Sequence, residues 1–172
     1  MKKSILTIAS VAFLFAACDN SSKTESTETP VATETPAATE TPAAAPTTEA
    51  VVTLNAGDDM KYDLADITVK AGQTVKLTLH HTGKQPVTAM GHNFVLLAQG
   101  VDVDNFAKEA IAAKDNDYIP TAMANDVIAH TKTIGGGEST EITFTAPAAG
   151  AYDFLCSFPG HSAMMRGKFV VE

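Results

Sequence analysis

The stretch CSFPGHSAMM, which begins at Cys156, places a thiol, an imidazole and two thioethers close together in the chain. Pro159 and Gly160 predict a turn after the cysteine, so the side chains of Cys156, His161 and Met165 can meet at one point. Thiolate, imidazole and thioether ligands suit copper, which binds strongly to two histidines and one cysteine in a plane and weakly to a distant axial methionine. The loop therefore predicts part of a copper site.

A site of this kind needs a second histidine from outside the loop. His92 is the best candidate, because it follows Gly91 at the start of a predicted strand in the sequence AMGHNFVL. Met164 competes with Met165 for the axial position, but the spacing favours Met165 and leaves Met164 as a surface side chain. Zinc could occupy the same ligands.

Cys156 has two other interpretations. A lone cysteine is often a small buried hydrophobic residue, but the nearby His161 and Met165 favour metal binding. A cysteine hydrolase would use Cys156 as nucleophile and His161 as base. The sequence shows neither an evident third group to orient the histidine nor a nucleophile-loop signature.

The elements that must position these residues are mostly strands. Residues 74–82 (TVKLTLHHT) and 139–147 (STEITFTAP) alternate apolar and polar side chains, as half-buried strands do. Further strand candidates, separated by Gly, Pro, Asn and Asp turns, lie at 65–72, 92–98, 126–134, 150–156 and 167–172. Short strands in this number predict an antiparallel sandwich.

One segment breaks the strand pattern. Residues 105–115 (NFAKEAIAAKD) bring Phe106, Ala110 and Ile111 onto one helical face. Asp104 or Asn105 is the expected N-terminal cap. We expect a single helix packed beside the sandwich.

The N-terminal residues predict export and tethering. Residues 1–17 have two lysines, an apolar run and small residues, as a signal peptide does, and FAAC resembles a bacterial lipobox in which Cys18 becomes lipid-modified. Residues 18–50 repeat TETP among Ala, Thr, Ser and Glu and predict a disordered linker, which leaves residues 51–172 as the folded domain. The alternative to lipidation is ordinary signal-peptide cleavage, with Cys18 as an incidental free thiol. The alternative for the repeat segment is an O-glycosylated stalk.

The net charge of −8 gives no basic surface for nucleic acid.

Across nearly all of residues 51–172 the chain resembles the azurins, within the cupredoxin family of small blue-copper proteins. The resemblance rests on GDDMKYD, AMGHNFVL, DNDYIP, VIAHTKTIGGGE and CSFPGHSAMMRG. It implies an all-β, Greek-key β-sandwich of seven or eight strands with one inserted helix and one type 1 copper ion. It also implies equatorial ligands His92, Cys156 and His161, the axial ligand Met165, and a weak contact from the Gly91 carbonyl on the opposite side.

The resemblance assigns further residues around the copper. Asn93 would brace the ligand loop, the Phe158 amide would donate to the Cys156 sulfur and so tune the reduction potential, and His81 would lie near the site but off the metal. His80 and His130 are expected to be solvated. Redox partners such as cytochromes or oxidoreductases would dock on a patch around His161, formed by Pro86, Ala89, Met90, Phe158, Ala163 and Met164.

These ligands predict an electron carrier and not an enzyme. Three strong and two weak ligands leave no open position for a substrate. The alternative is a periplasmic protein that binds, stores or delivers copper. Such a protein would need exposed, exchangeable ligands such as tracts rich in Met or His, and none is evident in the sequence. The lipid at Cys18 would hold the carrier at a membrane of the bacterial cell envelope, on its periplasmic or outer-surface side.

Two features depart from the azurins. Azurins usually carry a disulfide near their N-terminal strands, and the corresponding segments here contain no cysteine. They often have a buried tryptophan beside a ligand histidine, where this chain has Phe94 and no tryptophan anywhere. The lipidated tether is more similar to membrane-anchored relatives such as auracyanin.

Overall fold

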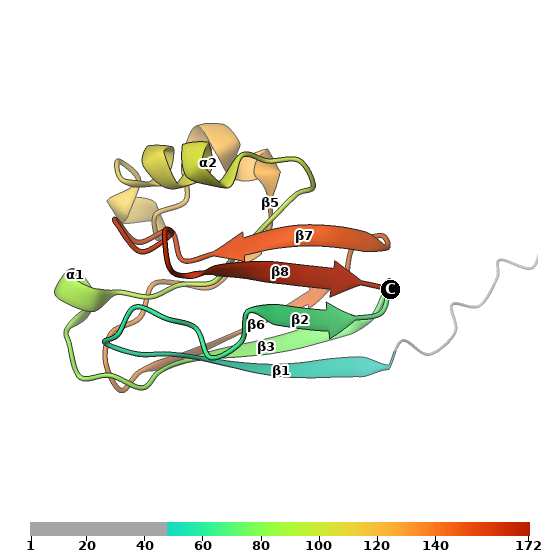
Figure 1. Ribbon diagram of the computed structural model, residues 1–172, viewed down its shortest axis with the longest axis horizontal. Coiled ribbons are helices and arrows are strands. Elements are labelled where there is room, and N and C mark those ends of the chain that lie inside the picture. The colour runs from blue at the N-terminus through green and yellow to red at the C-terminus, as the bar shows by residue number, and fades with distance from the viewer. Residues whose placement is uncertain (1–47) are drawn as a thin grey trace, which may run out of the picture. The chain divides into compact units, whose positions relative to one another are not determined.

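The computed structural model describes residues 48–172 (Figure 1). The predicted signal peptide, Cys18 and most of the predicted linker lie outside the described residues. Within residues 48–172 the strands are β1 (Glu49–Ala56), β2 (Asp66–Val69), β3 (Thr74–His81), β4 (Val95–Leu97), β5 (Val127–His130), β6 (Ser139–Thr145), β7 (Gly150–Leu155) and β8 (Arg166–Val171). The helical segments are α1 (Val87–Met90), α2 (Val103–Ala110) and two 3₁₀ turns, η1 (Lys114–Asn116) and η2 (Thr121–Asp126).

The strands form two sheets, with the orders β1-β3-β6 and β2-β8-β7-β4-β5. The predicted all-β sandwich is therefore confirmed. However, β1 pairs with β3 in parallel and β2 pairs with β8 in parallel, so the prediction of an antiparallel sandwich is wrong at these two pairs. Parallel neighbours require crossover connections rather than tight hairpins, and the turn signals between consecutive strands do not reveal such pairings.

The main core lies between the two sheets and follows the predicted alternation of β3. Val75, Leu77 and Leu79 are fully buried and His81 is nearly so, whereas the side chains between them are half-buried. The core also takes in Phe154 and other apolar side chains of the five-stranded sheet. Each fully buried side chain of this size contributes roughly 1.5–3 kcal/mol.

A second hydrophobic cluster lies between the five-stranded sheet and α2, which Figure 1 shows outside the sandwich, beyond β7. It contains Phe106 of α2 together with Val95, Leu97, Ile119 and Leu155. All three residues of β4 are buried as a result, because one face of the strand joins the main core and α2 covers the other.

Helix α2 differs from the prediction at both ends. Its cap is Asp102, whose carboxylate accepts hydrogen bonds from the amides of Asp104 and Asn105. Asp102 has the extended backbone that a capping residue needs, so the helix begins before the two residues predicted as caps. Phe106 is buried as predicted, but Ile111 lies just past the helix end and is 57% exposed.

The start of the fold also differs from the predicted boundary. Strand β1 begins at Glu49, within the segment that the sequence assigned to the linker. Among residues 48–172 no helix has the length and apolar character needed to cross a membrane.

Candidate metal centre

Three predicted ligands converge at one end of the sandwich. His92 lies just before β4, Cys156 directly follows β7, and His161 lies in the loop between β7 and β8. The Cys156 Sγ is 4.0 Å from the Nδ1 of His92 and 3.7 Å from the Nδ1 of His161, and the two nitrogens are 3.2 Å apart. The three residues form a cluster that could hold a metal ion.

The β7–β8 loop is folded by hydrogen bonds within itself. The His161 amide donates to the Phe158 carbonyl, and the His161 carbonyl accepts from the amides of Met164 and Met165. The Cys156 amide donates to the Met165 carbonyl and closes the loop. Met165, the predicted axial ligand, is fully buried, whereas Met164 is 55% exposed, as expected of a surface side chain.

His92 is held by residues far away in the sequence. Its backbone amide and carbonyl both pair with Ile134, in an isolated antiparallel bridge. Its Nε2 lies 2.9 Å from the Gly57 carbonyl oxygen, a partner that requires a proton on this nitrogen. The Nδ1 is then left as the free acceptor that faces Cys156 and His161.

Asn93 connects the His92 segment to the β7–β8 loop. Its side-chain carbonyl accepts from the Ser157 amide at 2.9 Å, and its amide group donates to the Ser157 hydroxyl and to the Asp117 carbonyl, both at 2.8 Å. Asn93 is fully buried, so these bonds are shielded from water. The role expected of Asn93, to brace the loop that follows Cys156, fits these contacts.

Gly91 lies where a side chain could not fit. An ideal Cβ at this position would lie 2.7 Å from the Phe158 ring and 2.7 Å from the Val87 carbonyl oxygen. The resulting close approach leaves the Gly91 carbonyl oxygen 3.9 Å from the Cys156 Sγ. The Gly91 carbonyl, which the resemblance expects to contact copper weakly, therefore lies beside the Cys156 thiol.

Burial controls the protonation of the three donors. It raises the pKa of the Cys156 thiol to about 11, although hydrogen bonds from the Asn93 and Phe158 amides oppose the rise. Burial, with smaller effects from neighbouring imidazoles, lowers the pKa of His161 to about 4, and it also lowers the pKa of His92. Neutral imidazoles are the metal-binding form, and a buried thiolate requires a nearby cation to offset its loss of hydration.

His81 lies beside the three donors with its own nitrogens engaged. Its Nε2 is 2.7 Å from the Met90 carbonyl oxygen, and its Nδ1 accepts from the Gly83 amide at 3.1 Å. Its ring centroid is 4.4 Å from that of His92. His81 therefore packs behind a donor histidine, as expected, while His80 bonds to Ser139 and His130 is exposed.

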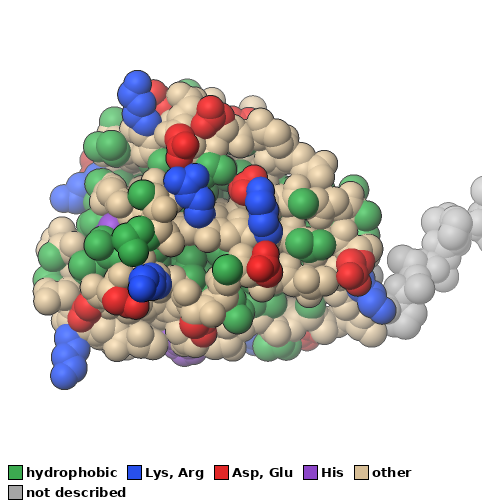
Figure 2. Space-filling view, in the orientation of Figure 1, with side chains coloured by type: hydrophobic (Ala, Val, Ile, Leu, Met, Phe, Trp, Pro, Cys, Tyr) green, Lys and Arg blue, Asp and Glu red, His purple; other side chains and the backbone are tan. Residues whose placement is uncertain are grey.

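The predicted docking patch is mixed in its exposure. Pro86, Ala89, Ala163 and Met164 are exposed, Met90 is half-buried, and Phe158 is buried with its ring 4.7 Å from that of His161. Val87, which the prediction did not include, is 39% exposed. Figure 2 shows hydrophobic side chains at the end of the domain where α1 lies in Figure 1. Of the three donors, only His161 retains any exposure, at 3%.

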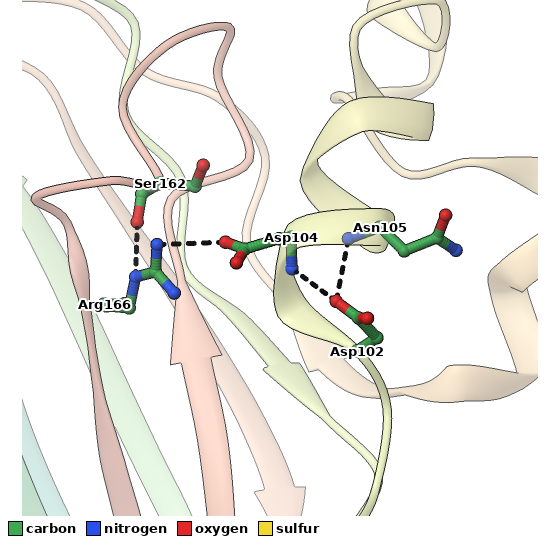
Figure 3. A network of polar contacts seen from close by, with 5 residues as sticks. All are labelled: Asp102, Asp104, Asn105, Ser162 and Arg166. Atoms are coloured by element: carbon green, nitrogen blue, oxygen red, sulfur yellow. Dashed lines mark hydrogen bonds and ion pairs between the residues drawn. The ribbon is translucent and has the colours of Figure 1, made fainter.

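Arg166 joins the β7–β8 loop to α2 (Figure 3). Its Nε donates to the Ser162 carbonyl at 2.8 Å, and a terminal nitrogen of its guanidinium lies 3.0 Å from an Asp104 carboxylate oxygen. Asp104 in turn belongs to the helix turn capped by Asp102. The loop that carries His161 is thus connected to the second hydrophobic cluster through α2.

The donor set fits a small transition-metal ion. Three donors in a plane at roughly 2.0–2.3 Å from one ion would be about 3.5–4.0 Å from one another, which is close to the spacings observed here. One thiolate and two neutral imidazoles, with a buried methionine at the end of the same loop, suit copper.

Comparison with known proteins identifies the family of this chain. Residues 48–172 match the family described as copper binding proteins, plastocyanin/azurin family, and the chain belongs to this family. Membership of this family and the cluster of His92, Cys156 and His161 together support copper as the bound metal.

Three relatives illustrate the similarity. Outer membrane protein H.8 of Neisseria gonorrhoeae is 44% identical over 119 residues, which cover 67% of this chain and 64% of that protein. The azurin of Pseudomonas chlororaphis is 39% identical over 126 residues, covering 70% of this chain and 97% of the azurin. The structure of dithionite-reduced auracyanin from Roseiflexus castenholzii matches with a TM-score of 0.65 and 37% identity, over 73% of this chain and 98% of that one.

Sequence reasoning missed two side chains at this site. Tyr62 donates its hydroxyl hydrogen to the Asn93 carbonyl, and Arg166 holds the Ser162 carbonyl. Tyr62 stands within the quoted segment GDDMKYD, but no local pattern places that segment beside Asn93. Arg166 directly follows Met165, so its position next to the loop was a usable signal.

Proposed function

We propose that this chain is a membrane-tethered blue-copper protein that carries single electrons between redox partners. In this proposal His92, Cys156 and His161 would hold the copper as its strong ligands, and Met165 and the Gly91 carbonyl would contact it weakly. The observation that carries the proposal is the convergence of one buried thiol and two buried imidazoles, with donor atoms 3.2–4.0 Å apart.

Copper supplies one-electron chemistry when it is bound, because it alternates between Cu(II) and Cu(I). The chain's contribution is to fix the donors and exclude water. Asn93 and Ile134 hold the two ligand-bearing segments through buried hydrogen bonds. Donors held this firmly keep nearly the same positions in both oxidation states, which lowers the rearrangement that each electron transfer requires. We infer an electron carrier rather than an enzyme.

The visible spectrum after addition of Cu(II) tests the ligand set. Oxidised protein with one copper per chain should be intensely blue, from charge transfer between thiolate and copper, and the colour should disappear on reduction. Cys156→Ser should abolish the blue colour, while His130→Ala, which changes an exposed histidine, should keep it. Wild-type protein that binds copper but stays pale would contradict the trigonal thiolate site.

We propose that partners such as cytochromes or oxidoreductases dock around His161. Apolar groups around the most accessible donor let a partner exclude water and approach closely, and a small interface lets it leave after each transfer. Ala89→Glu or Met164→Lys should leave the blue spectrum nearly unchanged and slow electron self-exchange, measured by NMR line broadening. Val51→Lys, on an exposed residue of β1, is the control. Unslowed exchange in both patch variants would show that electrons leave by another face.

We propose that Cys18 is lipid-modified and holds the protein to a membrane of the bacterial cell envelope, on its periplasmic or outer-surface side. The lipobox-like FAAC supports this proposal, and so does a relative whose name is outer membrane protein H.8. Full-length protein expressed in a bacterium should partition with membranes, and Cys18→Ala should leave it unprocessed or release it. An unacylated mature N-terminus in mass spectrometry would contradict the proposal.

A further inference from the structure

The ring of His161 is held differently from the ring of His92. The Nε2 of His92 lies 2.9 Å from the Gly57 carbonyl oxygen, whereas within residues 48–172 no protein atom makes a hydrogen bond to the Nε2 of His161. A hydrogen bond at the second ring nitrogen usually orients a metal-binding histidine. The orientation of the His161 ring in metal-free protein therefore depends on packing.

Phe158 is the aromatic side chain that packs on His161, and it is itself packed on Tyr118. The ring centroids of Phe158 and His161 are 4.7 Å apart. Those of Tyr118 and Phe158 are 5.1 Å apart, with an angle of 64° between the ring planes. Edge-to-face pairs of this kind prefer a defined geometry and stabilise it beyond the area that they bury. The rings thus form a continuous series from Tyr118 through Phe158 to His161.

Tyr118 reaches Phe158 from a strained bend in the backbone. Asp117 and Tyr118 have φ values of 50° and 59°, in the left-handed region that is uncommon for residues other than glycine. Such conformations cost energy and persist only where surrounding contacts fix them. Here the Asp117 carboxylate accepts from the Thr133 amide and the Asp117 carbonyl accepts from the Asn93 side chain, both at 2.8 Å. Strain of this kind concentrates at functional sites, which indicates that the direction of the Tyr118 ring matters to the donors.

We propose that Tyr118 is a positioning residue, which fixes the orientation of the His161 imidazole through the ring of Phe158. The strained bend holds one end of the aromatic series, and the donor histidine lies at the other end. An imidazole that is already oriented loses less rotational freedom when it binds a metal. The part of this inference that concerns copper rests on the proposed function, and the part that concerns metal-free protein does not.

The test compares Tyr118→Leu with Tyr118→Phe and with a matched control at Tyr152. Tyr118→Leu removes the ring, whereas Tyr118→Phe keeps the ring and loses only the hydroxyl. Tyr152 belongs to the same hydrophobic cluster, is 5% exposed against 8% for Tyr118, and lies on β7, where its hydroxyl donates to the Ala148 carbonyl. Tyr152→Leu therefore removes a similarly buried tyrosine ring elsewhere in the domain.

NMR of metal-free protein gives the first readout. ¹³C relaxation of the imidazole CH groups should show larger motions of His161 in Tyr118→Leu than in wild type, Tyr118→Phe or Tyr152→Leu. The His92 ring should be unchanged in every variant, because the Gly57 carbonyl holds it. Unchanged motion of His161 in Tyr118→Leu, or equally increased motion in Tyr152→Leu, would overturn the inference.

Copper-loaded protein gives the second readout. The blue absorption band and the copper hyperfine splitting in electron paramagnetic resonance should shift in Tyr118→Leu, while Tyr118→Phe and Tyr152→Leu match wild type. If Tyr118→Leu fails to fold, metal-free wild-type protein decides: its His161 imidazole should be as rigid as that of His92, and a clearly more mobile His161 ring would overturn the inference. Wild-type protein that binds copper but stays pale would instead reject the proposed ligand set, so the two failures are distinguishable.

Discussion

The β7–β8 loop is held mainly by hydrogen bonds between its own residues, whereas the segment around His92 is held by residues far away in the chain. Within the loop, the amides of Cys156, His161 and Met165 all find backbone partners in the same loop. The His92 segment instead depends on Gly57 and Ile134. One half of the candidate site is therefore a local structure, and the other half exists only when the whole domain is folded.

This difference assigns separate roles to the two segments. The loop brings three predicted ligands together over a short span, so its shape survives small changes elsewhere in the domain. The position of His92 relative to the loop depends on Asn93 and on the packing of Gly91 against Phe158. Changes at this junction should cost more stability than changes at the outer side of the loop.

Copper binding should produce the largest effect, because the metal would join the two segments directly. At a free copper concentration about 1,000 times the dissociation constant, binding adds about 4 kcal/mol to the free energy of unfolding. Denaturant unfolding of wild-type protein with and without copper measures this difference, and Cys156→Ser should lose most of it. An equal gain in Cys156→Ser would show that copper stabilises the domain elsewhere.

Removal of the Asn93 side chain should have the next largest effect. Asn93→Ala leaves the buried Ser157 amide without its partner, at roughly 1–3 kcal/mol, and also removes the bonds to the Ser157 hydroxyl and the Asp117 carbonyl. We expect the free energy of unfolding of metal-free protein to fall by about 3 kcal/mol in chemical denaturation.

A matched control is available on α2. Asn105 is exposed, and only its backbone amide takes part in the helix cap, so Asn105→Ala should leave stability nearly unchanged or raise it slightly. A loss at Asn93 no greater than that at Asn105 would contradict the role of Asn93 as the link between the two segments.

The difference between local and long-range contacts also explains how much could be predicted from the sequence. The turn at Pro159 and Gly160 and the alternation of β3 are local patterns, and they correctly predicted a compact loop and a half-buried strand. The parallel pairing of β2 with β8 and the contact of Tyr62 with Asn93 join distant residues, and no local pattern encodes them.

The helix cap shows a different limit. Asp102, Asp104 and Asn105 are all residue types that cap helices well, so side-chain chemistry alone did not select among them. The structure uses Asp102, and Phe106 of the helix that it caps packs against Val95 and Leu97. The local sequence left this boundary open.

The close approach at Gly91 gives a smaller predicted effect. Its backbone, with φ −75° and ψ 139°, is accessible to any residue, so Gly91→Ala tests packing alone. The added methyl group must displace the Phe158 ring or the Val87 carbonyl, and overpacking of this kind costs about 2 kcal/mol. Because Phe158 packs on His161, the blue absorption band of the copper-loaded variant should also shift.

Gly100→Ala separates this effect from backbone strain. Gly100 has a φ of 79° and open space around its Cβ position, so alanine there costs about 1 kcal/mol through conformation and should not alter the absorption band. A band shift in Gly100→Ala, or none in Gly91→Ala, would argue against the packing explanation.

Arg166 should give the smallest effect, because its contacts lie on the exposed side of the more self-contained segment. The Arg166 and Asp104 side chains are 41% and 78% exposed, and exposed ion pairs contribute about 0–1 kcal/mol. We expect Arg166→Ala to lower the free energy of unfolding by about 0.5 kcal/mol. Hydrogen exchange should nevertheless become faster at the Met164 and Met165 amides, since the lost bond to the Ser162 carbonyl no longer restrains their turn.

Two further variants separate the parts of the Arg166 contact. Asp104→Asn removes the ion pair and keeps the bond to Ser162, so it should leave hydrogen exchange in the loop unchanged. Lys168→Ala removes another exposed ion pair, with Asp153, on the strand that follows the loop, and should match Arg166→Ala in stability but not in hydrogen exchange. If Lys168→Ala accelerates exchange at Met164 and Met165 to the same extent, the loop responds to the stability of β8 as a whole. The bond between Arg166 and the Ser162 carbonyl would then have no specific role in holding the donors.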